Sequence, residues 1–184
     1  MVPPPPPAAG RSEPAPRRYD VVFCDVDGCL MPEFTEPADV VALGAIAEHN
    51  ARAARDRDRP IVVPCTGRPQ PFCEAVCKVL GRLGGIPAIC EHGGCRYYFE
   101  DHRWAIEPGI TDADRDALRA AERWVERDLS SLGCFLELGK HTGVTIIHPD
   151  PDHLHRDLLP MIRRTVVERG WPFQVATTWT CVNL

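Results

Sequence analysis

The sequence is short of lysine and has no long hydrophobic run, and we expect no secretory leader because no leader-like apolar segment precedes the cysteines. Of its 21 basic residues, only Lys78 and Lys140 are lysines. The longest nearly apolar stretch, residues 40–47, is far too short to span a bilayer. A formal net charge of −5 argues against a general affinity for nucleic acid or acidic membranes. We therefore expect a cytoplasmic protein with no nucleic-acid or membrane partner, and the sequence carries no signal for an oligomeric state.

The nine cysteines lack the spacing of a zinc site or a disulfide framework. Their number is odd, none form a C-x₂-C pair, and many lie inside apolar runs. Cys73 and Cys77 could join Cys90, His92 and Cys95 as metal ligands, but we favour buried thiols. Reduced cysteines agree with a cytoplasmic protein.

Residues 1–17 differ in composition from the rest of the chain. They hold seven of the 19 prolines and almost nothing to bury. We expect a disordered, partly polyproline tail. A ligand for an SH3-type domain is the less favoured alternative.

Residues 18–100 alternate between short apolar runs and segments with helical periodicity, which favours βαβ units and a parallel sheet. The strand-like runs lie at residues 20–25 and within 60–69 and 86–94, and the helical segments at 38–56 and 71–83.

The pattern of apolar and polar residues changes near residue 100, and no internal repeat is evident. The pattern predicts a helix, two strands, a second helix and one or two closing strands, forming a small separate sheet covered by helices. The predicted elements are residues 112–130, 134–139, 143–149, 152–169 and strands within 171–184.

Three polar motifs follow the three predicted strands of the first part. They are DVDG at residues 25–28, CTGRP at 65–69 and EHGG at 91–94. Ligands bind at the carboxyl ends of strands in open α/β sheets, so we expect these motifs to share one site. Asp25 and Asp27 repel each other unless a cation, a phosphate-handling role or solvent compensates. A capped turn is the plain alternative for the first motif alone.

In this order, the motifs resemble those of the haloacid dehalogenase superfamily, particularly Cof-type and sucrose-phosphatase-like phosphatases. The resemblance covers residues 18–184. It implies an α/β fold, with the first half of a Rossmann-like core at residues 18–100 and an inserted α/β cap at 101–184.

The resemblance also implies a magnesium-dependent phosphohydrolase. Its substrate would be a small phosphorylated metabolite, and the large cap favours a sugar phosphate. Asp25 would attack phosphorus, and Asp27 would protonate the leaving oxygen and later deprotonate water. Mg²⁺ would bind the Asp25 carboxylate and the Asp27 backbone carbonyl.

The other two motifs would hold the phosphate and the substrate. Thr66 and the Gly67 amide are suited to phosphate oxygens. Arg68 could reach the substrate, or only pair with a carboxylate on the surface. His92 and Gly93 stand where many members of the superfamily have Asn-Gly, which bears on substrate contacts.

Two elements of the superfamily's mechanism are not found in the expected place. These are a lysine after the cap and a Gly-Asp turn with a further acid, and no Gly-Asp dipeptide occurs in the sequence. Lys140 is interpreted as a residue of a cap hairpin. We expect that a downstream segment is lacking and that this chain is incomplete for catalysis. A non-catalytic phosphate-binding module and a phosphomutase or phosphotransferase are the alternatives.

Overall fold

The structure, a computed structural model, describes residues 19–33 and 36–184. The predicted tail at residues 1–17 lies outside this part of the chain. Helices and strands are mixed, with one parallel and two antiparallel sheets, which confirms the predicted α/β class. In the described residues, no helix is long and apolar enough to cross a membrane.

The first part of the molecule is built on a parallel pair of strands. These are β1 (Val21–Cys24) and β2 (Ile61–Pro64), and α1 (Val40–Asp56) connects them. The Asp39 side chain caps α1 by accepting hydrogen bonds from two backbone amides at 3.0 Å. Because β1 and β2 run parallel, their carboxyl ends lie at the same edge of the sheet.

The third predicted strand, β3 (Ala88–Cys90), joins β2 through a single parallel bridge between Cys65 and Ile89. It then pairs antiparallel with β4 (Cys95–Tyr98), and β4 pairs with β5 (Arg103–Ile106). The sequence analysis did not predict β4 and β5. Their segments, CRYY and RWAI, mix polar and apolar residues over only four positions each.

Helix α2 (Gln70–Leu80) covers this sheet, beginning after Pro69, with Pro71 in its first turn. On the far side, β1 is an outer strand, and its Val22 and Phe23 are about half exposed. The buried cluster under α2 consists of Ala53, Ile61, Val63, Cys73, Cys77, Leu83, Ala88, Cys90, Cys95 and Tyr97.

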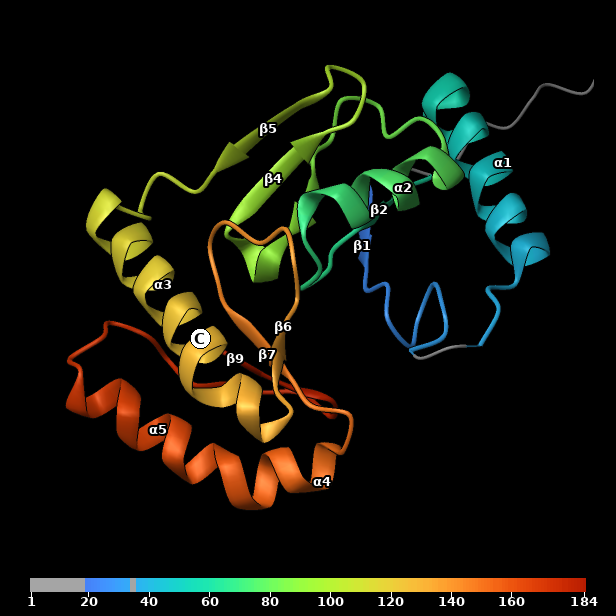
Figure 1. The fold of residues 1–184 in the computed structure, drawn as a ribbon. Helices are drawn as coiled ribbons and strands as arrows, with labels where there is room; N and C mark the ends of the chain where they lie inside the picture. Colours follow the sequence, from blue (N-terminus) through green and yellow to red (C-terminus); the bar gives the residue numbers. More distant parts are fainter. Residues whose placement is uncertain (1–18, 34–35) are drawn as a thin grey trace, which may run out of the picture.

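The second part, which we call the cap, is an antiparallel sheet covered by α3 (Asp112–Trp124) and α5 (Leu159–Glu168) (Figure 1). Its four strands run in the order β6-β7-β9-β8 and bury a cluster around Trp124, Ile146 and Ile162. The order of elements follows the prediction, with two closing strands. The remaining elements are β6 (Phe135–Leu136), β7 (Thr145–Ile147), α4 (Pro151–His153), β8 (Ala176–Thr177) and β9 (Cys181–Asn183).

Strands β6 and β7 are much shorter than the predicted strands at residues 134–139 and 143–149. The chain between them leaves the sheet as a hairpin tip, residues 137–143, which reaches back to the first part of the molecule (Figure 1). The Glu137 amide still pairs with the Thr145 carbonyl at 3.0 Å, whereas the amides of His141 and Thr142 bond to Glu91 of the core.

The buried Asn50 offers a test of how the core is held together. Its side chain donates to the carbonyls of Val62 and Leu80 at 2.9 and 3.3 Å and accepts from the Val62 amide at 2.9 Å. Asn50→Leu leaves these three buried backbone groups without their hydrogen-bond partner, so we expect the free energy of unfolding to fall by about 2–4 kcal/mol. Urea denaturation measures the loss. The control, Arg52→Ala, removes an exposed ion pair on the same helix and should cost less than about 0.5 kcal/mol. Equal losses would contradict this account.

Candidate functional site

Asp25 and Asp27 follow β1 on either side of a buried valine. Val26 is fully buried, and its carbonyl accepts the Met31 amide at 2.8 Å. Burial of Val26 anchors the turn that carries both carboxylates. Gly28, at φ +75°, lets the chain turn sharply after them. Both aspartates line a cavity at this end of the sheet.

The loops after β2 and β3 pack tightly against each other. Thr66 is buried, and its hydroxyl accepts the Arg68 amide at 3.0 Å. The His92 amide donates to the Thr66 carbonyl at 3.3 Å. A side chain at Gly67 would place its first carbon 2.3 Å from the His92 ring, so only glycine permits this approach. The two loops therefore form one rigid wall beside the aspartates.

The cavity has a volume of about 750 Å³ and lies between the core and the cap. Five predicted site residues line it: Asp25, Asp27, Gly67, Arg68 and His92. Thr66 lies behind the wall, and Gly93 is not among the lining residues. The structure thus brings most of the predicted residues together, while their chemical roles stay predictions. The cap contributes Phe135, Glu137, Lys140, Thr145, Ile147, His148, Pro149, Pro151, Thr178, Thr180, Cys181 and Asn183, and Glu33 completes the lining.

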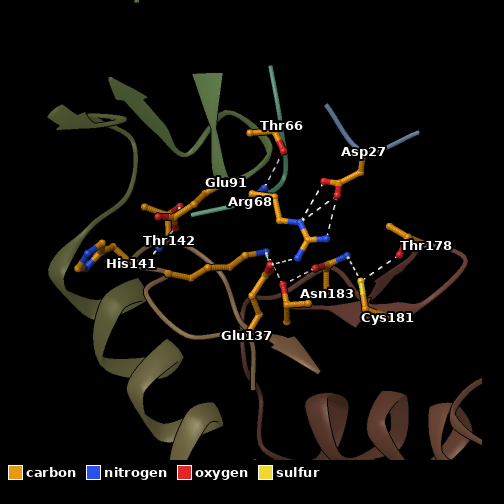
Figure 2. Close-up of polar contacts among 12 residues, drawn as sticks. Asp27, Thr66, Arg68, Glu91, Glu137, His141, Thr142, Thr178, Cys181 and Asn183 are labelled. Carbon is orange, nitrogen blue, oxygen red and sulfur yellow. Dashed lines mark hydrogen bonds and ion pairs between the residues drawn. The ribbon is translucent and has the colours of Figure 1, made fainter. Parts of the chain in front are cut away.

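Arg68 joins the core side of the cavity to the cap side. Its Nε and Nη2 donate to the Asp27 carboxylate at 3.0 and 2.8 Å, and its Nη1 donates to Glu137 at 2.8 Å (Figure 2). The hydrogen bond to Asp27, followed by the one to Glu137, raises the pKa of Arg68. Planar, two-pronged pairing of this kind is specific to arginine.

Lys140 is on the hairpin tip, as the sequence predicts, but its ammonium group lies in the cavity. The side chain is only 4% exposed, and Nζ is 3.0 Å from the Glu137 carboxylate. Nζ also donates to the Thr145 hydroxyl, which donates to Asn183 at 2.6 Å. A polar network thus runs from Asp27 through Arg68 and the cap to Asn183.

His92 lies next to this network and is exposed at the cavity wall. The partial loss of water around its ring lowers the pKa of His92, and the positive charge of Lys140 lowers it further. Asn183, Glu137 and Asp25 act in the opposite direction. The net lowering means that the imidazole is mainly neutral at pH 7.

The charge of the cavity bears on whether a cation could bind there. Four carboxylates line it, against only two cationic side chains, so a phosphate would meet net repulsion. Asp25 and Asp27 offer the hard oxygen donors that Mg²⁺ prefers, and Mg²⁺ commonly takes one or two carboxylates together with water and substrate phosphate. In the described part of the chain, no group of three or more His, Cys, Asp or Glu residues could hold a metal. The residues therefore fit an ion shared with a phosphate.

The cysteines considered as metal ligands lie elsewhere. Cys73 and Cys77 of α2 pack with Cys90 and Cys95, which face each other across β3 and β4. All four are fully buried free thiols, and His92 lines the cavity instead of joining them. They pack as small apolar side chains.

Sequence reasoning missed the contribution of the cap to the site. Glu137 is 69 positions from Arg68, and no local pattern links the two. Asn183 belongs to no motif, and the EHGG motif gave no sign that Glu91 contacts the cap. The one signal in the sequence for a cap contribution was Lys140, one of only two lysines, which lies three positions after Glu137 at a predicted turn.

Solved structures share this fold over most of the chain. A trehalose-6-phosphate phosphatase related protein matches with a TM-score of 0.56 and 22% identity, over 90% of this chain and 67% of its own. A haloacid dehalogenase-like hydrolase from Bacteroides thetaiotaomicron matches with a TM-score of 0.60 and 13% identity, over 91% and 71%. The sucrose-phosphatase from Synechocystis sp. PCC6803, solved with sucrose and phosphate, matches with a TM-score of 0.50 and 15% identity. The match covers 80% of this chain and 58% of the sucrose-phosphatase.

These matches show that the chain has the haloacid dehalogenase-like fold. It spans between 58% and 71% of the length of the three structures. No family model and no curated protein sequence matches it.

The placement of Lys140 can be tested through His92. Because the lysine charge disfavours protonation of the imidazole, Lys140→Met should raise the pKa of His92. NMR titration of the ring carbon-bound protons measures this, and the spectrum of His92→Gln assigns the signal. Lys78→Met, which neutralises the exposed lysine of α2, is the control and should leave the pKa unchanged. A His92 pKa above the ordinary histidine value, or one indifferent to Lys140→Met, would contradict the described geometry.

Proposed function

We propose that this chain, which has the haloacid dehalogenase-like fold, is a phosphohydrolase acting on a small phosphorylated metabolite through an aspartyl-phosphate on Asp25. The observation that carries the proposal is the placement of Asp25 and Asp27. They stand together at the carboxyl end of β1, on the wall of a cavity that lies between the core and the cap. The names of the matched phosphatases support the same reaction class.

Asp25 is suited to be the nucleophile. The Val26 amide donates to its Oδ1 at 2.8 Å, which fixes the orientation of the carboxylate. In the first step a carboxylate oxygen forms a bond to phosphorus, and the bond from phosphorus to the ester oxygen breaks. Water then attacks the phosphorus, which releases phosphate and regenerates the carboxylate.

Asp27 is suited to move the proton in both steps. It would give a proton to the leaving oxygen and take one from the attacking water. Arg68 holds both oxygens of this carboxylate in a two-pronged contact, so one of these hydrogen bonds would break when Asp27 donates its proton. The buried Thr66 supports Arg68 from behind through the Arg68 amide.

Magnesium fits the excess of carboxylates in the cavity, with the Asp25 carboxylate and the Asp27 backbone carbonyl as its protein ligands. When bound, the ion would neutralise charge between these carboxylates and the phosphate. Arg68, the Gly67 loop and His92 would contact the phosphate and its ester group from the wall of the cavity.

The size and lining of the cavity favour a sugar phosphate as the substrate. A volume of about 750 Å³ admits a small metabolite, and the cap covers the site against larger ones. Carboxylate, amide and hydroxyl groups from Glu137, Asn183 and Thr145 suit a ligand rich in hydroxyl groups. Nine free thiols support a reducing, cytoplasmic setting.

Phosphate release from a panel of sugar phosphates, with and without Mg²⁺, tests the proposal. Asp25→Asn should lower turnover by about a thousandfold or more, because the nucleophile is lost. Asp27→Asn should lower it by about 10²- to 10⁴-fold, the usual contribution of a general acid and base. Asp128→Asn removes an exposed carboxylate of the cap and is the control.

Three outcomes would contradict the proposal. Turnover that persists in Asp25→Asn excludes this nucleophile. Transfer of phosphate to an added sugar in place of water identifies a phosphotransferase. Phosphate that raises the melting temperature with no ester hydrolysis identifies a non-catalytic binding module.

A further inference from the structure

One core carboxylate holds residues 141 and 142 of the hairpin tip. Glu91 follows β3 and is buried, and its Oε2 accepts three hydrogen bonds from the tip. They come from the His141 amide at 2.8 Å, the Thr142 amide at 2.7 Å and the Thr142 hydroxyl at 2.8 Å (Figure 2). Charge-assisted hydrogen bonds to backbone amides are among the stronger contacts in proteins.

The surrounding surface is shaped to receive the tip. A side chain at Gly94 would place its first carbon 2.1 Å from the Thr142 hydroxyl oxygen, so glycine alone allows this approach. On the other side of the tip, the His141 ring stacks on Trp104 of β5, with ring centres 4.9 Å apart. The first part of the molecule thus contacts the tip at both Thr142 and His141.

The local backbone at Glu91 is unusual for a residue with a side chain. Glu91 and His92 both have positive φ angles, +50° and +56°, which cost free energy in residues other than glycine. The second oxygen of Glu91, Oε1, is buried and has no hydrogen-bond partner. A strained, incompletely satisfied carboxylate is a poor device for stability alone, which points to a positioning role.

The residue before the docked pair is Lys140. Its side chain is 4% exposed, whereas that of Lys78, the other lysine of the chain, is 64% exposed. Docking of His141 and Thr142 fixes the backbone next to Lys140, and the ammonium group then reaches Glu137 inside the cavity.

We propose that Glu91 is a positioning residue, which docks the hairpin tip on the core and so places the Lys140 ammonium group in the cavity, where it meets the negative charge of the substrate. The second clause rests on the proposed phosphatase function. The first does not, because it concerns only the placement of Lys140.

The chain's two lysines provide a direct test of the placement. Brief acylation with acetic anhydride, followed by mass spectrometry of peptides, gives the labelling rate of Lys140 with Lys78 as the internal reference. In Glu91→Ala, Lys140 labelling should rise about tenfold or more relative to Lys78, because the tip opens locally. Glu91→Gln, which keeps one acceptor oxygen, should give a smaller rise.

Two further variants separate positioning from a general loss of stability. Gly94→Ala leaves Glu91 intact but pushes against Thr142, so it should also expose Lys140. Glu100→Ala removes another core carboxylate, one that accepts the Leu83 amide at 2.6 Å far from the tip, and should leave Lys140 protected. Unchanged Lys140 labelling in both Glu91→Ala and Gly94→Ala, or an equal rise in Glu100→Ala, would overturn the proposal.

The substrate clause is tested by steady-state kinetics with p-nitrophenyl phosphate and Mg²⁺. Glu91→Ala and Lys140→Met should raise KM by a similar factor with a smaller effect on kcat, and the double variant should be no worse than Lys140→Met. Glu100→Ala should leave KM unchanged. An unaltered KM in Glu91→Ala with exposed Lys140 would overturn this clause. A wild-type protein that hydrolyses nothing, yet gives the expected labelling, would overturn the substrate clause for this chain and leave the positioning role in place.

Discussion

The Arg68 guanidinium group is the contact on which the candidate site depends. It pairs with Asp27 of the core and Glu137 of the cap at once, so one side chain sets the distance between the two parts of the cavity. Glu137 in turn pairs with Lys140, whose hairpin tip is docked by Glu91. Since each charge has an opposite partner, the network tolerates burial that an isolated charge would not. The cavity is therefore a joint product of core and cap.

Local signals were sufficient to predict much of the core and the half of the site that belongs to it. Apolar runs marked β1, β2 and β3, and the polar residues after each run meet where the carboxyl ends of the strands meet. Asp25, Asp27, Gly67, Arg68 and His92 line the cavity for this reason. The helices were also visible in the sequence, because apolar residues recur at helical spacing within residues 38–56 and 71–83.

The remainder depends on contacts between distant residues and could not be predicted from local pattern. β4 and β5 form because each gives the other a partner, although neither has a clear alternation of its own. The hairpin tip leaves the cap sheet because residues about fifty positions earlier bind it. Glu91 accepts its backbone amides, and Gly94 leaves room for Thr142. The predicted roles of Thr66, Gly93 and the magnesium ion stay predictions, since they concern ligands rather than the fold.

The central claim is that the Asp25 carboxylate becomes bonded to phosphorus during turnover. The direct measurement is mass spectrometry of acid-quenched Asp27→Asn protein after reaction with p-nitrophenyl phosphate and Mg²⁺. That substrate needs little help from a general acid, whereas loss of the Asp27 base slows hydrolysis of the adduct. We expect one phosphoryl group on the peptide that contains Asp25. Phosphoryl transfer to another residue, or hydrolysis with no adduct on that peptide, would contradict the account.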